Sequence, residues 1–228
     1  MIVKYMMRGL MVAVIFRGVN PFRAPAAGYP FIRRTLTTRK QSLVDNQLKD
    51  SVTERNRLAT ELLTAARQVG QVGKRAPLEE RQKLDQLALQ LQPFSDPQPA
   101  RIPFTGTHSL VYSGSDSGPT SGLIGPFVGK VTQVFHNETV YQNRVRFGPL
   151  QVSIFGRRQP LSDTEIQVGF YRTQIHMWDK LLVDRHVDLW RNPGSWQHIF
   201  VGQVEVDGES LLLRVMNTPK LFILQQPI

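Results

Sequence analysis

Two segments in the first half of the chain carry apolar residues at helical spacing. Between residues 42 and 69 they recur every three, four or seven residues, which is the stripe of an amphipathic helix. Gly70 and Gly73 follow, where glycine commonly ends a helix. A second stripe begins at Pro77, a residue suited to a first helical turn, and stops at Pro93. Residues 41–92 are therefore predicted to form a helical pair that packs on the rest of the chain.

Beyond residue 104 the pattern changes to a period of two. Short alternating runs separated by turn residues are typical of antiparallel strands. Eight or nine such strands would make a small closed barrel, and a sandwich fits the pattern nearly as well. The apolar positions predicted to line an interior, where they would contact a lipid, are Phe127, Val131, Phe135, Val152, Ile154, Ile166, Val168, Phe170, Phe200 and Phe222.

Four prolines, at positions 93, 97, 99 and 103, predict a stiff extended linker between the two patterns. The expected organisation is a leader over residues 1–40, the helical pair over 41–92, this linker over 93–104 and a β-barrel domain over 105–228. The fold class is therefore α+β and mainly β, with an antiparallel barrel preceded by two short amphipathic helices.

Charge separates the leader from the rest. Residues 1–40 hold eight basic side chains and no acidic one, whereas the other 188 residues hold 20 basic and 18 acidic ones. An Arg-rich, acid-free start is typical of an organellar presequence, and its scarcity of serine favours a mitochondrial address. The remainder is almost neutral, which argues against nucleic-acid binding. No apolar run reaches the length of a transmembrane helix.

Candidate chemistry is sparse. The chain has no cysteine, which excludes a disulfide, a thiolate zinc site and a thiol nucleophile. His186 lies between Asp184 and Asp188, but no nucleophile motif accompanies it. His136 and His198 are interpreted as strand-end or surface residues, and the three tryptophans as core or rim packing. The sequence predicts no enzyme activity, cofactor or metal site.

Three segments resemble the plastid lipid-associated proteins, also called plastid fibrillins. Residues 106–113 (GTHSLVYS) match the family's Gly-x-Trp-x-Leu-x-Tyr-Ser/Thr strand, with His108 in place of the tryptophan. Residues 125–135 (GPFVGKVTQVF) and 213–226 (LRVMNTPKLFILQQ) resemble later strands of the same family. The likeness covers roughly residues 45–227, and the three pieces occur in order at the right separations.

The resemblance implies a lipocalin-like barrel in plastids, associated with plastoglobules or thylakoids. Such a protein would bind or organise carotenoids, fatty acids or quinones without catalysis, and would touch membranes only peripherally. In lipocalin-like barrels the tryptophan closes one end and an arginine packs on it. The resemblance therefore gives barrel closure to His108 and Arg214.

Two further hypotheses stay open at this stage. The chain is a structural or interaction subunit of an organellar complex, mitochondrial in one version, with a filled barrel and helices that dock on a partner. Alternatively it is a hydrolase or isomerase that uses His176 or His186 with a neighbouring aspartate. Plastid localisation follows from the resemblance, while leader composition favours mitochondria.

Overall fold

The fold was analysed in a computed structural model, which describes residues 38–115, 121–124, 127–187 and 193–228. The predicted leader lies outside these ranges except for residues 38–40, which begin the first helix. Asp188 and Trp190 also lie outside them.

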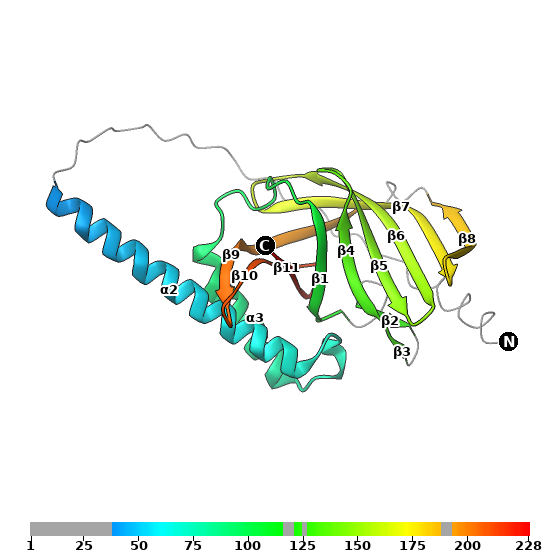
Figure 1. The fold of residues 1–228 in the computed structure, drawn as a ribbon, viewed down its shortest axis with the longest axis horizontal. Coiled ribbons are helices and arrows are strands. Elements are labelled where there is room, and N and C mark those ends of the chain that lie inside the picture. Colours follow the sequence, from blue (N-terminus) through cyan, green and yellow to red (C-terminus); the bar gives the residue numbers. More distant parts are fainter. Residues whose placement is uncertain (1–37, 116–120, 125–126, 188–192) are drawn as a thin grey trace.

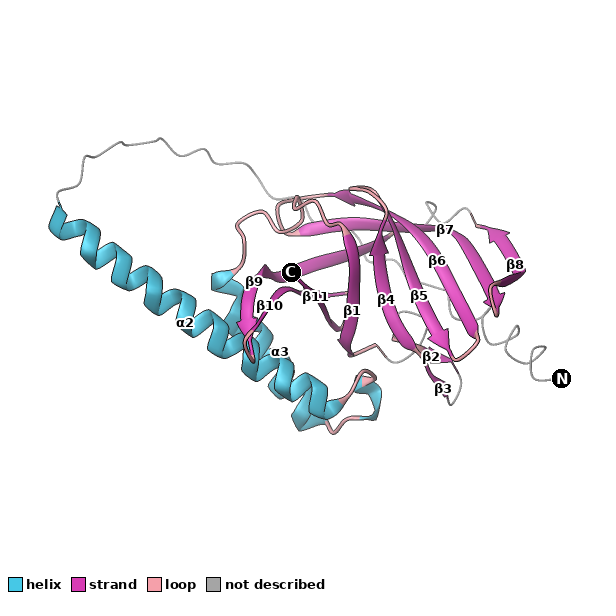
Figure 2. Cartoon of the chain, in the orientation of Figure 1, coloured by secondary structure: helices cyan, strands magenta, loops and turns pink. Residues whose placement is uncertain are grey.

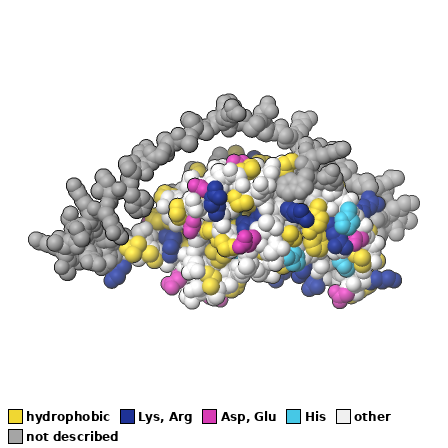
Figure 3. All heavy atoms as spheres, turned by 90° about the horizontal axis from the view of Figure 1, so that it is seen from above, with side chains coloured by type: hydrophobic (Ala, Val, Ile, Leu, Met, Phe, Trp, Pro, Cys, Tyr) yellow, Lys and Arg dark blue, Asp and Glu magenta, His cyan; other side chains and the backbone are white. Residues whose placement is uncertain are grey.

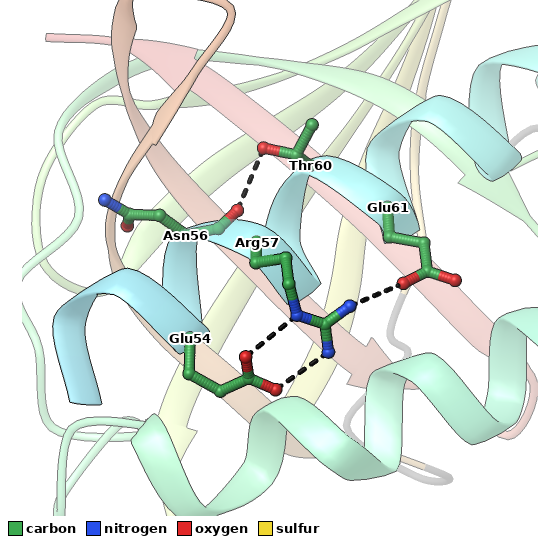
Figure 4. A network of polar contacts seen from close by, with 5 residues as sticks. All are labelled: Glu54, Asn56, Arg57, Thr60 and Glu61. Carbon is green, nitrogen blue, oxygen red and sulfur yellow. Dashed lines mark hydrogen bonds and ion pairs between the residues drawn. The ribbon is translucent and has the colours of Figure 1, made fainter. Parts of the chain in front are cut away.

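Two helices precede the strands, as predicted, and lie together on one side of the barrel (Figure 2). Helix α2 spans Thr38–Val69 and α3 spans Leu78–Leu91, with 3₁₀ turns η1 at Gly73–Arg75 and η2 at Gln92–Phe94. Gly70 ends α2 with a left-handed φ of 85°, and its amide donates to the Ala66 carbonyl at 3.0 Å. On the outer face Arg57 bridges Glu54 and Glu61, one turn away on either side (Figure 4).

Eleven strands follow in the described ranges, and they account for the alternating runs of the sequence. Their bounds are β1 (Gly106–Ser113), β2 (Leu123–Ile124), β3 (Phe127–Val128), β4 (Lys130–Phe135), β5 (Val140–Phe147), β6 (Leu150–Pro160), β7 (Glu165–Met177), β8 (Lys180–His186), β9 (Gly194–Val206), β10 (Glu209–Asn217) and β11 (Leu221–Pro227).

The large sheet closes on itself (Figure 1). Its strands run in the order β6-β5-β4-β1-β11-β10-β9-β7-β8, and β6 also pairs with β7, so eight antiparallel strands form a ring. β7 is long enough to pair with β9 at its start and with β8 at its end, which leaves β8 outside the ring. The predicted mainly-β, barrel-like fold with two preceding helices is confirmed.

Two apolar clusters hold the fold together because the period of two gives each strand two faces. One cluster lies between the helices and the outer face of β9, β10 and β11, and includes Leu62, Leu84 and Leu213. The other faces the inside of the ring and includes Val131, Val145 and Leu224. The helical pair therefore covers one outer side of the barrel.

The Pro-rich segment is packed against the barrel rather than extended in solvent. Ser95 Oγ accepts from the Val201 amide at 3.1 Å, and the Ala100 amide donates to the Asp163 carbonyl at 2.9 Å. Ala100 and Phe104 are fully buried in the interior cluster. The four prolines predict a stiff segment, but the burial of its apolar residues Ala100 and Phe104 determines how it packs on the barrel.

Candidate functional site

Eight of the ten residues predicted to line the barrel belong to or pack on the interior cluster. Val131, Phe135, Val152, Ile166, Val168 and Phe222 are buried there, and Ile154 and Phe170 are partly buried against it. Whether they contact a ligand stays a prediction.

Phe127 and Phe200 are wrong as lining positions. Phe127 is 58% exposed on the two-residue strand β3, which pairs only with β2 and stands apart from the ring. Phe200 is fully buried, but in the cluster beneath the helices. Phe200 shares its face of β9 with Val204 and Val206, as alternation requires, but this face packs against the helices and not towards the barrel interior.

Polar side chains occupy inward positions among these apolar ones. Along the sheet His108 is opposite Gln133, and Gln133 is opposite Asn143, which places all three on one row across β1, β4 and β5. All three are 2% exposed or less. The Gln133 amide donates to Asn143 Oδ1 at 2.9 Å. A polar band therefore crosses the interior between Phe135 and Val131 on the same face of β4.

Arg214, on β10, is the charged centre of this band. It is fully buried, its guanidinium lies 3.7 Å from the centre of the Phe104 ring, and Nη1 donates to Gln133 Oε1 at 2.9 Å. The resemblance implies that this arginine packs on His108. Phe104 takes that place instead, and His108 is edge-on to Phe104 with 5.8 Å between ring centres. Phe104, from the Pro-rich segment, therefore closes this end of the barrel.

A second arginine, Arg158 of β6, approaches the same phenylalanine. Its guanidinium lies 4.8 Å from the Phe104 ring centre. Nε donates to the Glu138 carbonyl at 2.6 Å and Nη2 to the Ile102 carbonyl at 2.8 Å. Arg158 thereby ties the β4–β5 turn and the Pro-rich segment to the closed end.

These two cations have no buried anion beside them in the described ranges. The buried residues there include Arg158 and Arg214 but no aspartate or glutamate. Burial lowers the pKa of Arg214 well below its ordinary value, and the nearby Arg158 lowers it further. Stacking on phenylalanine offsets part of the cost of burying the charge, by about 2 kcal/mol for a desolvated pair.

Several buried hydrogen-bond donors are also without a partner among the described residues. They are Arg214 Nε, Arg158 Nη1, Asn143 Nδ2 and the Tyr141 hydroxyl. Each such group costs about 1–3 kcal/mol when left unsatisfied in a protein interior. Each of these donors lacks a hydrogen-bond acceptor, and an oxygen-bearing group from outside the chain would supply one.

Two histidines complete the band in the neutral form. Burial, and then the charge of Arg214, lowers the pKa of His108 and of His198 to about 3. His198 Nε2 lies 3.5 Å from Arg214 Nη2, so a contact there requires Nε2 to accept. The interpretation of His198 as a strand-end or surface residue is wrong, since it is 2% exposed and faces the interior.

The residues weighed for catalysis lie elsewhere. Asp184 on β8 accepts two hydrogen bonds from Arg172, and the bond from Nε is 2.8 Å long. These bonds, followed by one from Gln174, lower the pKa of Asp184. The carboxylate thus forms an ion pair with Arg172 outside the barrel interior, rather than a hydrogen bond with His186. The described residues contain no cluster of three metal-binding side chains.

Sequence reasoning missed Phe104, Tyr141, Asn143, Arg158 and the inward direction of His198. Gln133 and Asn143 carried a usable signal, because each is a polar residue at an inward position of an alternating strand. Phe104 carried none, since it precedes the first strand within a Pro-rich segment. Nothing in the alternation predicted that Arg158 would reach across to that segment.

A comparison of the chain with protein-family models, curated proteins and solved structures finds no significant match.

Proposed function

We propose that this protein is a non-catalytic binding protein for a lipophile that carries an oxygen-bearing head group. The observation that supports the proposal is the polar band inside the barrel, with two buried arginines, unpartnered donors and no acidic side chain among the described buried residues. A carboxylate would neutralise the charge of the buried arginines and also accept hydrogen bonds from the unpartnered donors. A fatty acid is therefore the best-matched of the candidate ligands, ahead of a quinone and of a hydrocarbon carotenoid.

The apolar part of such a ligand has a matching surface beside the band. Val131, Val145 and Val152 are opposite one another across β4, β5 and β6, one inward row farther from the Phe104 end. All three are buried in the interior cluster. Burying an alkyl chain against such residues contributes roughly 25 cal/mol per Å² of apolar surface. The head group would point towards Arg214 and the tail away from it.

The test is a titration of the full chain with palmitic acid and with hexadecanol, which keeps the tail and removes the charge. We expect one saturable site for palmitic acid and at least about tenfold weaker binding of hexadecanol, since hydrogen bonds to a charged group contribute about 1.5–3 kcal/mol. Arg214→Gln is expected to remove that preference. Arg172→Gln, which removes an arginine outside the barrel interior, is the matched control and is expected to keep the preference.

Absence of saturable binding by any of these molecules would contradict the proposal and favour the second candidate. In that candidate the chain is an interaction subunit of an organellar complex. Its barrel is filled by side chains, and the polar band stabilises the barrel. The observation that favours it is the apolar surface left on α2 and α3, where Leu48, Leu78 and Leu89 are exposed. Affinity capture that depends on these leucines would then identify the partner surface.

Plastid localisation and association with plastoglobules or thylakoids belong to the proposal as well, and rest on the resemblance of residues 106–113, 125–135 and 213–226. The mitochondrial alternative rests on the Arg-rich leader. No helix in the described part of the chain is long and apolar enough to cross a membrane. Figure 3 shows charged side chains of both signs scattered over one face, without a continuous basic stripe.

A further inference from the structure

The end of the barrel opposite Phe104 carries exposed apolar residues on neighbouring turns. The Trp178 amide donates to the Pro149 carbonyl at 3.0 Å, which joins the β7–β8 turn to the β5–β6 turn. Gly129, directly after β3, lies against the Phe147 ring at the end of β5. These contacts place the exposed side chains at one end, which we call the apolar tip: Phe127, Val128, Trp178, Leu181 and Leu182.

Trp178 is exposed in a backbone conformation that does not favour it. The side chain is 76% exposed, so the interpretation of this tryptophan as core or rim packing is wrong. Trp178 and Asp179 have φ values of 44° and 65°, and a two-residue hairpin of this kind normally uses Asn and Gly. A bulky side chain at positive φ costs stability, and such sites concentrate where a protein acts.

Basic side chains surround the apolar tip. Lys130 and Arg146 are directly opposite each other on β4 and β5, and Lys180 follows the turn that holds Trp178. All three are exposed, and none forms an ion pair with another described residue. Like charges opposite each other destabilise a sheet unless an anion lies between or over them. Asp179 is the acidic residue on the same turn.

We propose that the apolar tip is a docking surface for an anionic lipid membrane. Tryptophan is enriched where a membrane meets water, because its ring is apolar and its N–H is polar. Lysine and arginine beside it would meet lipid phosphates. The five apolar side chains enter the interface while the three cations stay at head-group level, and the barrel stands on the membrane with Phe104 at the far end. This inference does not depend on a ligand inside the barrel.

The first test is flotation of the full chain with vesicles of phosphatidylcholine, with and without phosphatidylglycerol. Each basic residue near an anionic surface contributes about a factor of five in affinity. The triple variant Lys130→Gln, Arg146→Gln, Lys180→Gln is therefore expected to bind about a hundredfold more weakly. Its matched control, Lys49→Gln, Lys83→Gln, Arg157→Gln, removes as many exposed charges away from the tip and is expected to bind as the unaltered chain does.

A second test separates the tip from the basic leader, which would also attract anionic vesicles. Brominated lipids quench tryptophan fluorescence only at short range, and Trp178→Phe removes the tip's indole. We expect quenching in the unaltered chain and its loss in Trp178→Phe. Trp178→Asn is expected to weaken binding at least about tenfold and to keep or raise the melting temperature, since asparagine tolerates positive φ. Unchanged quenching in Trp178→Phe, or equal binding of both triple variants, would overturn the proposal and leave the tip as a surface for a protein.

Discussion

Replacing Phe104 by alanine is expected to lower the free energy of unfolding by about 3–5 kcal/mol, the usual cost of removing a buried phenylalanine. The loss arises from the contacts that the Phe104 ring makes. The ring supports Arg214 at 3.7 Å and Arg158 at 4.8 Å, and it packs on Phe135 with 5.4 Å between ring centres. Without it, two buried cations lose the π face that partly replaces water around them.

Urea unfolding of the unaltered and variant chains measures this loss. Phe127→Ala is the matched control, because it removes the same side chain at an exposed position and is expected to change stability by at most about 0.5 kcal/mol. Equal stability of the two variants would mean that Phe104 does not close the barrel. The same result would remove the reason for treating the Arg214 end of the barrel as the closed end, towards which the head group points.

Stability is also expected to fall steeply as the pH falls from about 6.5 towards 3. The pKa of His108 and of His198 is lowered to about 3 in the folded chain, while an unfolded histidine titrates near 6.5. Below pH 6.5 the unfolded chain therefore binds protons that the folded chain excludes, so protonation favours unfolding. Above pH 6.5 both forms are neutral and the effect disappears. Two such groups contribute up to about 2.7 kcal/mol per pH unit within this window.

Carboxylates titrate in the lower part of the same window, so the variants must isolate the histidine contribution. The free energy of unfolding is measured in urea from pH 7.5 to pH 4.5 for the unaltered chain and for His108→Gln, His198→Gln. The double variant is expected to lose most of the slope between pH 6.5 and 5, whatever its stability at pH 7.5. His136→Gln, at an exposed position, is expected to keep it. An unchanged slope in the double variant would contradict the burial of these imidazoles.

The sequence predicted the architecture because local periodicity carried the information. The stripe that ends at Gly70 and the alternation through Val131 and Phe135 each require only near neighbours, and both elements are present in the structure. Phe200 was assigned to the wrong face, because alternation groups it with Val204 and Val206 but does not show that this side of the strand faces the helices.

Most of the candidate site could not be predicted from the sequence, because it depends on contacts between distant segments. Arg214 was found through a resemblance, but its partners come from the Pro-rich segment, β4 and β9, which are separated widely along the chain. A polar residue at an inward position, such as Asn143, was a readable signal. The exposure of Trp178 was not, since a tryptophan in a turn gives no local indication of whether it is covered.

The capacity of the barrel to hold one lipophile is tested most directly by native mass spectrometry of the full chain, purified from a host supplied with fatty acid, quinone and carotenoid. The predicted result is a species heavier than the 25.9 kDa chain by a single lipophile, which organic solvent releases and which Arg214→Gln retains poorly. A chain at its own mass, with an empty extract and no binding on addition of palmitic acid, would contradict a ligand-binding barrel.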